Sequence, residues 1–254
     1  MKNNIFSLEN RRALVTGSSQ GIGLALSLAL ARAGATIILN GRDESRLDAT
    51  SQLFESENLD VECCAFDVTD RQQVIECIDQ LEHSGPIDIL VNNAGMQHRN
   101  NLEDFEFDDW DRLMDLNLNS VFNVSRSVAR HMIPRRKGKI INICSIQTAL
   151  ARPSIAPYTA SKGAVANLTK GMCADWAKYN IQANGLAPGY FETELTAALV
   201  ADQSFSDWLA QRTPAGRWGK VEELGGAVVF LASAASSFVN GHILYVDGGM
   251  GSCV

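Results

Sequence analysis

The sequence predicts an α/β protein built on one doubly wound parallel sheet of seven strands, with helices on both faces. Seven apolar, β-rich runs carry this prediction, at residues 12–17, 35–42, 61–68, 87–95, 139–145, 181–189 and 242–249. A loop follows every run, and all but the last loop lead into a segment of helical character. This alternation is typical of a parallel sheet that helices cover on both sides.

Length and composition favour a single domain that spans residues 1–254. A chain of 254 residues can bury one sizeable core, and α/β chains of this length often form one domain. Hydrophobic residues make up 46% of the chain and charged residues 20%, which is ordinary for a globular protein. The formal net charge of −7 argues against a nucleic-acid partner, because cationic side chains dominate binding to phosphate backbones.

The sequence gives no sign of a membrane segment or a metal site. Residues 1–10 lack an apolar stretch of signal-peptide length, and no run is long enough to span a bilayer. We therefore expect a cytoplasmic protein without a membrane partner. The six cysteines show no CxxC spacing and the four histidines are scattered, so we expect no bound metal.

The loop TGSSQGIG at 16–23 predicts a nucleotide site. Its glycines, Gly17, Gly21 and Gly23, follow the first strand and open an apolar helix at 22–34. Glycines let backbone N–H groups approach a diphosphate at the positive end of a helix. The other loops at the carboxyl ends of the strands are expected to surround the same ligand. A tight turn without a ligand is the alternative, and the GxxxGxG spacing differs from the GxGxxG fingerprint.

The end of the second strand favours NADP(H) over NAD(H). An acid at this place would bind the adenosine ribose of NAD, but the strand ends in Asn40 and Arg42 follows. The planar fork of an arginine suits a 2′-phosphate. Asp43 could oppose that phosphate, and we expect it instead to cap the helix at 44–54. NAD(H) is kept as the alternative cofactor, and a solvated Arg42 as the alternative interpretation.

Three residues within 145–162 predict acid–base chemistry at a hydroxyl or carbonyl. Tyr158 and Lys162 are four positions apart, so on a helix they share one face. A nearby ammonium favours the phenolate and should draw the tyrosine pKa down from about 10. Ser145 ends the fifth strand, where its hydroxyl could polarise the same substrate oxygen. Each residue alone would be better explained as a packed tyrosine, a surface lysine or an ordinary serine.

Together these features resemble the short-chain dehydrogenase/reductase family, over nearly the whole chain. The matching segments are TGSSQGIG, NNAG at 92–95, Ser145 with YTASK at 158–162, and PGYFET at 188–193. The GxxxGxG spacing is the family's own form. The resemblance implies a Rossmann-like fold, Tyr158 as general acid/base, and Lys162 as the residue that tunes the tyrosine and binds the nicotinamide ribose. Ser145 would hold the substrate oxygen.

The resemblance also implies the remaining catalytic and cofactor residues. Asn117, in LMDLNLNS, matches a helical asparagine that binds a water in a proton relay, and Asn119 is the competing assignment. The implied cofactor contacts are Gly17, Ser19, Gln20, Gly21, Ile22, Gly23, Arg42, Asp67, Val68, Asn93, Ala94, Gly95, Tyr158, Lys162, Pro188, Gly189 and Thr193.

Segments outside these shared motifs resemble the gluconate 5-dehydrogenase, or 5-keto-D-gluconate reductase, group of the family. They are NAGMQHR, the stretch at 141–165, NGLAPGYFETELT, RTPAGRWG and SSFVNGHILYVDGG. The implied reaction is hydride transfer between NADP(H) and a sugar acid, at C5 of 5-ketogluconate or its alcohol. Candidate substrate residues are Gln97, Arg99, Ser145, Gln147, Arg152 and Tyr190, and a solvated loop position is the alternative for each. The group often has a glutamate where this chain has Ala149, so a related polyol or keto acid is also considered.

Two further expectations follow from the family resemblance. Residues 190–212 should form a short helical lid over the substrate, with Phe205, Trp208 and Leu209 as its apolar underside, and plain helix packing is the alternative. A homotetramer or homodimer is expected, in which Val165, Leu168 and Met172 either face a partner or belong to the core.

The sequence disfavours two functions other than catalysis. A protein that only binds the cofactor would have no need of a tyrosine whose pKa is adjusted by a lysine. A structural subunit of an assembly should have an extended tail or an extra apolar surface element, and the sequence shows neither. Within enzymes, a 3-oxoacyl-carrier-protein reductase is the main alternative because it shares every catalytic residue. The carrier protein of such a reductase is acidic, so a basic docking patch is expected at the mouth of the cleft. The basic turn PRRKGK at 134–139 is too remote from the catalytic motifs to supply that patch.

Overall fold

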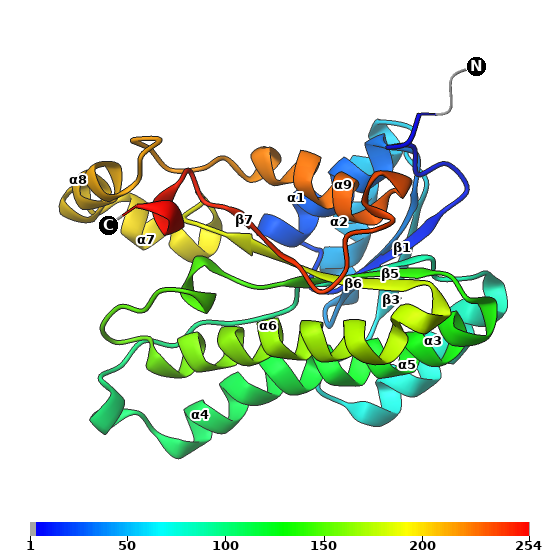
Figure 1. Ribbon diagram of the computed structural model, residues 1–254, viewed down its shortest axis with the longest axis horizontal. Coiled ribbons are helices and arrows are strands. Elements are labelled where there is room, and N and C mark those ends of the chain that lie inside the picture. Colours follow the sequence, from blue (N-terminus) through cyan, green and yellow to red (C-terminus); the bar gives the residue numbers. More distant parts are fainter. Residues whose placement is uncertain (1–3, 254) are drawn as a thin grey trace.

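Seven strands form one parallel sheet in the computed structural model, which describes residues 4–253. In sheet order they are β3 (Val61–Ala65), β2 (Thr36–Gly41), β1 (Arg12–Val15), β4 (Ile89–Asn92), β5 (Gly138–Ile143), β6 (Ile181–Pro188) and β7 (Ile243–Val246) (Figure 1). Every pairing between neighbouring strands is parallel. The predicted seven-stranded, doubly wound fold is confirmed.

Helices cover both faces of the sheet in two layers (Figure 1). One layer holds α1 (Gly21–Arg32), α2 (Glu44–Ser56) and α9 (Gly225–Ala232). The other holds α3 (Arg71–Ser84), α4 (Phe107–Met114), α5 (Ser120–Arg135) and α6 (Ala156–Trp176). The central strands are buried on both sides, which is why they appear in the sequence as continuous apolar runs rather than alternating ones.

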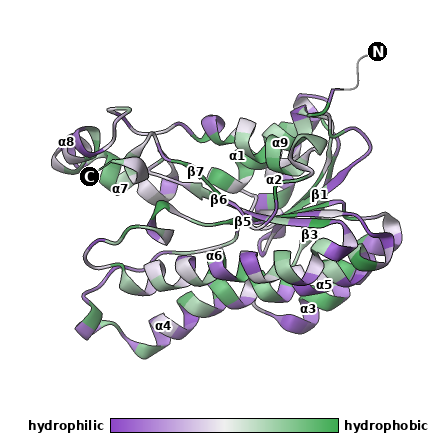
Figure 2. Ribbon diagram, viewed as in Figure 1, coloured by the Kyte–Doolittle hydropathy of each residue, from purple (hydrophilic) through white to green (hydrophobic). Residues whose placement is uncertain are grey.

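Two apolar cores lie between the sheet and its helix layers. Leu26 of α1 and Val228 of α9 belong to the first core, where α1 and α9 pack closely and are coloured hydrophobic along most of their length (Figure 2). The second core includes Ile78 of α3 and Val124 of α5. Val165 and Met172 of α6 are also buried in this second core, and Leu168 packs against it. These three residues therefore belong to the core rather than to a free face.

The strand order changes direction between β1 and β4, and this opens the ligand edge. The chain crosses from β3 through α3 to β4, so the loops after β1 and β4 diverge to opposite sides of the sheet. In doubly wound sheets the crevice at such a point, outside the carboxyl ends of the strands, is where ligands bind.

Two short helices project over this edge between β6 and α9. They are α7 (Ala197–Val200) and α8 (Gln203–Arg212), and they follow a 3₁₀ turn at Glu194–Thr196 (Figure 1). Asp202 caps α8 by accepting hydrogen bonds from the backbone N–H groups of Ser204 and Phe205. Arg212 donates to the carbonyl of Met250, which joins the projection to the C-terminal turn.

Within the described residues, none of the helices combines the length and the apolar character needed to cross a membrane.

Candidate active site

The glycine loop between β1 and α1 is held by the segment that follows β4. Gly17 has a φ of +62°, and a Cβ there would lie 2.9 Å from the Cα of Ala94. A Cβ on Gly23 would collide with the carbonyl of Gly17 and the side-chain amide of Asn93. Asn93 Nδ2 donates to the carbonyl oxygens of Thr16 and Gly17, both at 2.9 Å. The loop therefore forms a cradle of bare backbone at the N-terminus of α1, which suits a diphosphate.

Charged groups from β2, α2 and the loop after β3 gather beside this cradle. Arg42 Nη1 lies 3.5 Å from Asp67 Oδ2, and the arginine side chain is 78% exposed. Partial burial raises the pKa of Asp67, but hydrogen bonds from Thr69 and the charge of Arg42 hold it below its ordinary value. Asp43 accepts a hydrogen bond from the backbone N–H of Arg46 at 3.1 Å, as expected for an N-cap.

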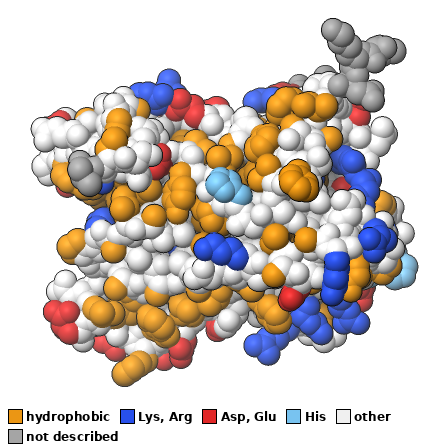
Figure 3. Space-filling view, viewed as in Figure 1, with side chains coloured by type: hydrophobic (Ala, Val, Ile, Leu, Met, Phe, Trp, Pro, Cys, Tyr) orange, Lys and Arg blue, Asp and Glu red, His pale blue; other side chains and the backbone are white. Residues whose placement is uncertain are grey.

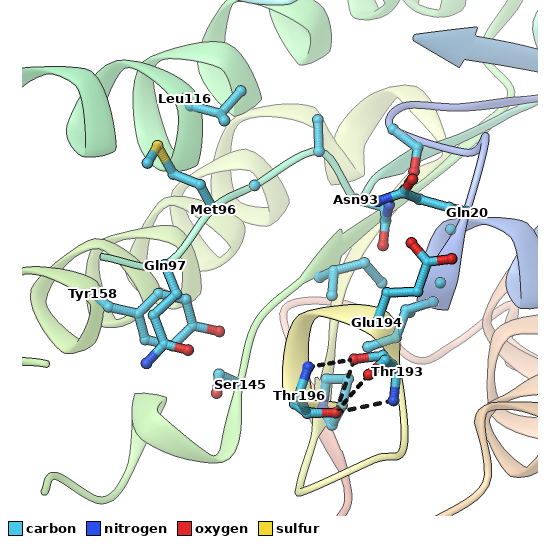
Figure 4. A pocket seen from close by; sticks show the side chains of 18 of the residues that line it. Gln20, Asn93, Met96, Gln97, Leu116, Ser145, Tyr158, Thr193, Glu194 and Thr196 are labelled. Carbon is cyan, nitrogen blue, oxygen red and sulfur yellow. Dashed lines mark hydrogen bonds between the residues drawn. The ribbon is translucent and has the colours of Figure 1, made fainter. Parts of the chain in front are cut away.

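One cavity of about 710 Å³ runs along the carboxyl ends of the strands and joins these groups. Every residue expected to bind the cofactor lines it, and so does every residue expected to bind the substrate. Asn117 is the one predicted site residue that lies behind this lining. Figure 4 shows Ser145 and Tyr158 together in one part of the cavity, and Gln20 and Asn93 in another.

Ser145, Tyr158 and Lys162 meet between β5 and α6. Lys162 Nζ lies 5.8 Å from the centre of the Tyr158 ring and donates to the carbonyl of Ile143 at 2.7 Å. Ser145 Oγ accepts a hydrogen bond from the backbone N–H of Gln147 at 3.2 Å, and the serine hydroxyl lowers the pKa of the nearby Tyr158 phenol. The serine hydroxyl and the phenol therefore present two polar hydrogens to one region of the cavity.

The predicted direction of the Tyr158 pKa shift is wrong in this structure. Burial raises the pKa of Tyr158 above its ordinary value, and the hydrogen bond from Ser145 only partly opposes this. Lys162 is itself buried, so its pKa is lowered, with a smaller opposing effect of Cys144. The Lys162 ammonium lies near the Tyr158 ring and is hydrogen-bonded to the Ile143 carbonyl. Desolvation of the phenol has the largest effect on the Tyr158 pKa.

Asn117 lies in a π-helical segment, Asp115–Asn119, that interrupts the helix between α4 and α5. Its side chain is fully buried, accepts from the backbone N–H of Met96 at 2.8 Å and donates to the Met96 carbonyl at 2.9 Å. Asn119 instead donates to Asp115 on the exposed side of the helix. Of the two candidates, the structure brings Asn117 to the site, and π-helical turns often occur at functional sites.

Two arginines from different loops lie together in the substrate part of the cavity. Partial burial lowers the pKa of Arg99, and the neighbouring charge of Arg152 lowers it further. Burial raises the pKa of Tyr190, and both arginines oppose that rise. Across residues 4–253, neither guanidinium forms an ion pair with an acidic side chain. The buried Oε1 of Gln147 likewise has no hydrogen-bond partner there.

Two positions near the predicted substrate residues in the sequence do not line the cavity. His98 Nε2 lies 3.3 Å from Asp109 Oδ2, and its ring packs edge-on against Phe105, so it fastens the loop after β4 to α4. Ala149 is exposed at the end of the turn Ile146–Thr148 and is absent from the cavity lining. The methyl group of Ala149 therefore makes no contact with this cavity.

Comparison with known proteins decides the family. The profile described as short chain dehydrogenase matches residues 11–204. The chain belongs to the short-chain dehydrogenase family.

Members of this family from several bacteria are similar to the chain over its full length. The gluconate 5-dehydrogenase of Gluconobacter oxydans is 61% identical over 248 residues, which is 97% of each chain. The 5-keto-D-gluconate 5-reductase of Escherichia coli K12 is 49% identical over 98% of each chain. The crystal structure of a Burkholderia cenocepacia gluconate 5-dehydrogenase in complex with NADP and tartrate is 61% identical, with a TM-score of 0.96 over 98% of each chain.

Several residues of this short-chain dehydrogenase line the cavity without having been predicted. The main ones are Arg46, Met96, Phe191, Glu194, Thr196 and Leu199. Arg46 lies in the first turn of α2, four positions after Arg42, so its charge and its closeness in the sequence could have indicated it. Thr196 is hydrogen-bonded to Thr193 in a reciprocal cap, and Figure 4 shows the Glu194 carboxylate turned toward Gln20 and Asn93. The contacts of Thr196 and Glu194 depend on how the segment after β6 folds back over the cavity. No local pattern in the sequence predicts the path of this segment residue by residue.

Proposed function

We propose that this chain is a cytoplasmic, NADP(H)-dependent gluconate 5-dehydrogenase that interconverts gluconate and 5-ketogluconate. The observation that carries the proposal is the pair of guanidiniums without carboxylate partners, Arg99 and Arg152, in the same cavity as Ser145 and Tyr158. That pair calls for an anionic substrate with a reacting hydroxyl or ketone. The identities of 49% and 61% to enzymes named for gluconate and ketogluconate support the choice of sugar acid.

The glycine cradle and the charged groups beside it fit NADP(H). Backbone N–H groups at the start of α1 would bind the diphosphate, since Gly17 and Gly23 leave no side chain in the way. Arg42 would bind the 2′-phosphate and Asp67 the adenine, while Lys162 and Thr193 would hold the nicotinamide end. When bound, this cofactor supplies or accepts the hydride at the reacting carbon.

The proton is handled by residues of the chain itself. Tyr158 Oη would give a proton to the ketone oxygen during reduction, or remove it from the alcohol during oxidation. Ser145 would hold the same oxygen, and its bond to the phenol favours the phenolate. Asn117, fixed by Met96, would order the water that returns a proton to the tyrosine through Lys162.

The carboxylate of the substrate would bind to Arg99 and Arg152. A guanidinium binds a carboxylate with two parallel hydrogen bonds, and among residues 4–253 neither arginine has an acidic partner to displace. Gln97, Gln147 and Tyr190 would bind sugar hydroxyls, and the unpaired Oε1 of Gln147 offers an acceptor for one of them. A thioester substrate on a carrier protein has no carboxylate at this place, so the arginine pair favours the sugar acid.

Residues 190–212 would act as the lid. Tyr190 lies at the centre of an aromatic cluster, with ring centres 5.7 Å from Phe205, 6.2 Å from Trp208 and 5.8 Å from Trp218. Arg152 lies 5.7 Å from the centre of the Phe205 ring, so α8 packs directly on a substrate arginine. Movement of this segment would therefore open and close the substrate part of the cavity.

We also propose that the enzyme is a homo-oligomer, a tetramer or a dimer, assembled through α4 and α5. Phe107 is 87% exposed and Phe122 is 52% exposed on these helices. Figure 3 shows hydrophobic and acidic side chains over α4, and basic side chains toward the far end of α5 and α3. Two copies related by a twofold axis would bring acidic α4 toward Arg126 and Arg130 of the other copy.

Light scattering after gel filtration tests the assembly. Phe122→Glu should reduce the mass to that of a smaller species, whereas Leu53→Glu, at a 49% exposed position on α2, should not. An unchanged mass for Phe122→Glu would remove this face from the assembly.

The activity itself is tested by following reduced-nicotinamide absorbance with purified enzyme, NADPH and 5-ketogluconate, and with an acetoacetyl thioester as comparator. We expect rapid oxidation with the keto acid and a loss of kcat of about 10²–10⁴-fold in Tyr158→Phe. Tyr179→Phe, at a tyrosine that packs against the core away from the cavity, is the matched control and should be active. Turnover of the thioester alone would refute the proposed substrate.

A further inference from the structure

A second arginine lies beside Arg42 at the edge of the cavity. Arg46 comes from the first turn of α2, lines the cavity, and has a side chain that is 64% exposed. Its Nη1 donates to Gln20 Oε1 in the glycine loop at 3.2 Å, and its Nε lies 3.4 Å from Asp43 Oδ2. Arg46 therefore connects the helix after β2 to the loop after β1.

Two side chains of α2 contact the glycine loop. Besides the bond between Arg46 and Gln20, Thr50 Oγ1 lies 3.1 Å from the Ser19 carbonyl oxygen and 2.7 Å from the Arg46 carbonyl oxygen, to either of which its one hydroxyl proton can donate. Neighbouring backbone is close as well, since a Cβ on Gly41 would lie 3.8 Å from Ser19 Oγ. The helix that carries Arg46 is thus held against the glycine loop, and both Arg42 and Arg46 line the same cavity.

The two carboxylates nearby are already occupied, so they oppose an incoming anion less than their charge suggests. Asp43 Oδ1 accepts from Ser45 Oγ at 2.7 Å and from the Arg46 backbone at 3.1 Å. Asp67 Oδ1 accepts from the Thr69 N–H at 2.9 Å and the Thr69 hydroxyl at 2.7 Å. A guanidinium has five N–H donors, and most of those on Arg42 and Arg46 have no partner among residues 4–253.

We propose that Arg46 is a second cation for the 2′-phosphate of NADP(H), acting beside Arg42 as a specificity-determining residue. A phosphomonoester carries a charge of about −1.5 to −2 near neutral pH, which one guanidinium does not neutralise. In this arrangement Asp43 favours binding of NADP(H). Its carboxylate caps α2 and pairs with the Arg46 side chain, which orients that guanidinium toward the 2′-phosphate. The inference rests on the proposed NADP(H) cofactor.

Calorimetric titration with 2′,5′-ADP and with 5′-AMP, which differ only in the 2′-phosphate, tests the inference without the reaction. We expect Arg46→Gln to weaken binding of 2′,5′-ADP about tenfold, the lower range for a charged hydrogen bond, and to change 5′-AMP binding less than about twofold. Arg46→Lys should recover part of the loss, because it restores the charge but not the planar fork. Arg32→Gln is the matched control, since that exposed arginine on α1 pairs with Glu57 and lies outside the cavity.

The possible results separate the inference from the proposed cofactor. If the wild-type protein prefers 2′,5′-ADP and Arg46→Gln binds it as tightly, Arg42 acts alone and the role of Arg46 is refuted. If the wild-type protein binds 5′-AMP as well as 2′,5′-ADP, the NADP(H) preference fails, and the role of Arg46 fails with it. An equal loss for both nucleotides would mean that Arg46 only supports the glycine loop.

Discussion

Replacing Arg152 by glutamine removes one of the two guanidiniums that lie in the cavity near Tyr190, where we propose that the substrate binds. Glutamine keeps polar atoms and much of the side-chain length, so the cation over the Phe205 ring is lost without leaving a large void. Arg99 would then be the remaining guanidinium of the pair. It would have to hold the carboxylate of the substrate alone.

The magnitude follows from the exposure of the pair. A hydrogen bond to a charged group contributes about 1.5–3 kcal/mol, and the lower value applies because the pair is open to solvent, with Arg152 half-buried and Arg99 exposed. That value corresponds to about a tenfold loss of kcat/KM for 5-ketogluconate in Arg152→Gln. Because both arginines would bind one carboxylate, the double variant with Arg99→Gln should lose less than the product of the two single losses.

The assay compares 5-ketogluconate with an uncharged keto sugar of the same chain length. We expect the neutral substrate to be reduced poorly by the wild-type enzyme and to change less than about twofold in Arg152→Gln. Arg112→Gln, an exposed arginine on α4 outside the cavity lining, is the control. An equal loss for charged and neutral substrates would refute the carboxylate assignment, because it would show that Arg152 only supports α8.

Three further predictions concern the glycine loop, the segment after β6 and the opposite end of the sheet. Gly23→Ala should abolish detectable NADP(H) binding in a fluorescence titration, since its Cβ collides with Gly17 and Asn93, and normal binding would contradict the cradle. Glu194→Gln should tighten NADP(H) binding several-fold by removing a negative charge that faces the glycine loop, and weaker binding would show that the carboxylate has a supporting role. Burial lowers the pKa of Lys139 from its ordinary value of 10.5 to about 8. Between these two pH values, Lys139 therefore binds fewer protons in the folded state than in the unfolded state. Its contribution to stability should therefore rise with pH over this window, so Tm measured from pH 7 to 10 should rise more in the wild type than in Lys139→Met, and parallel curves would contradict the shift.

The strands were predictable because a parallel sheet covered on both faces needs unbroken apolar runs. Each of the seven runs contains or overlaps an observed strand, from β1 at Arg12–Val15 to β7 at Ile243–Val246. The π-helical segment around Asn117 was not predictable, because nothing local distinguishes it from the flanking turns of α4 and α5. Its position follows from the contact between Asn117 and the backbone of Met96, twenty-one residues earlier in the chain.

The sequence by itself determined the parts of this protein whose cause is local. The glycines that open α1, the acid that caps α2 and the one-turn spacing of Tyr158 and Lys162 act through backbone geometry over a few residues. Only the tertiary structure decided which distant groups meet: Arg99 with Arg152, Arg46 with Gln20, and Asn93 with the glycine loop. It also decided the direction of the Tyr158 pKa shift, because desolvation depends on everything packed around the phenol, whereas spacing along a helix reports only the nearest charge.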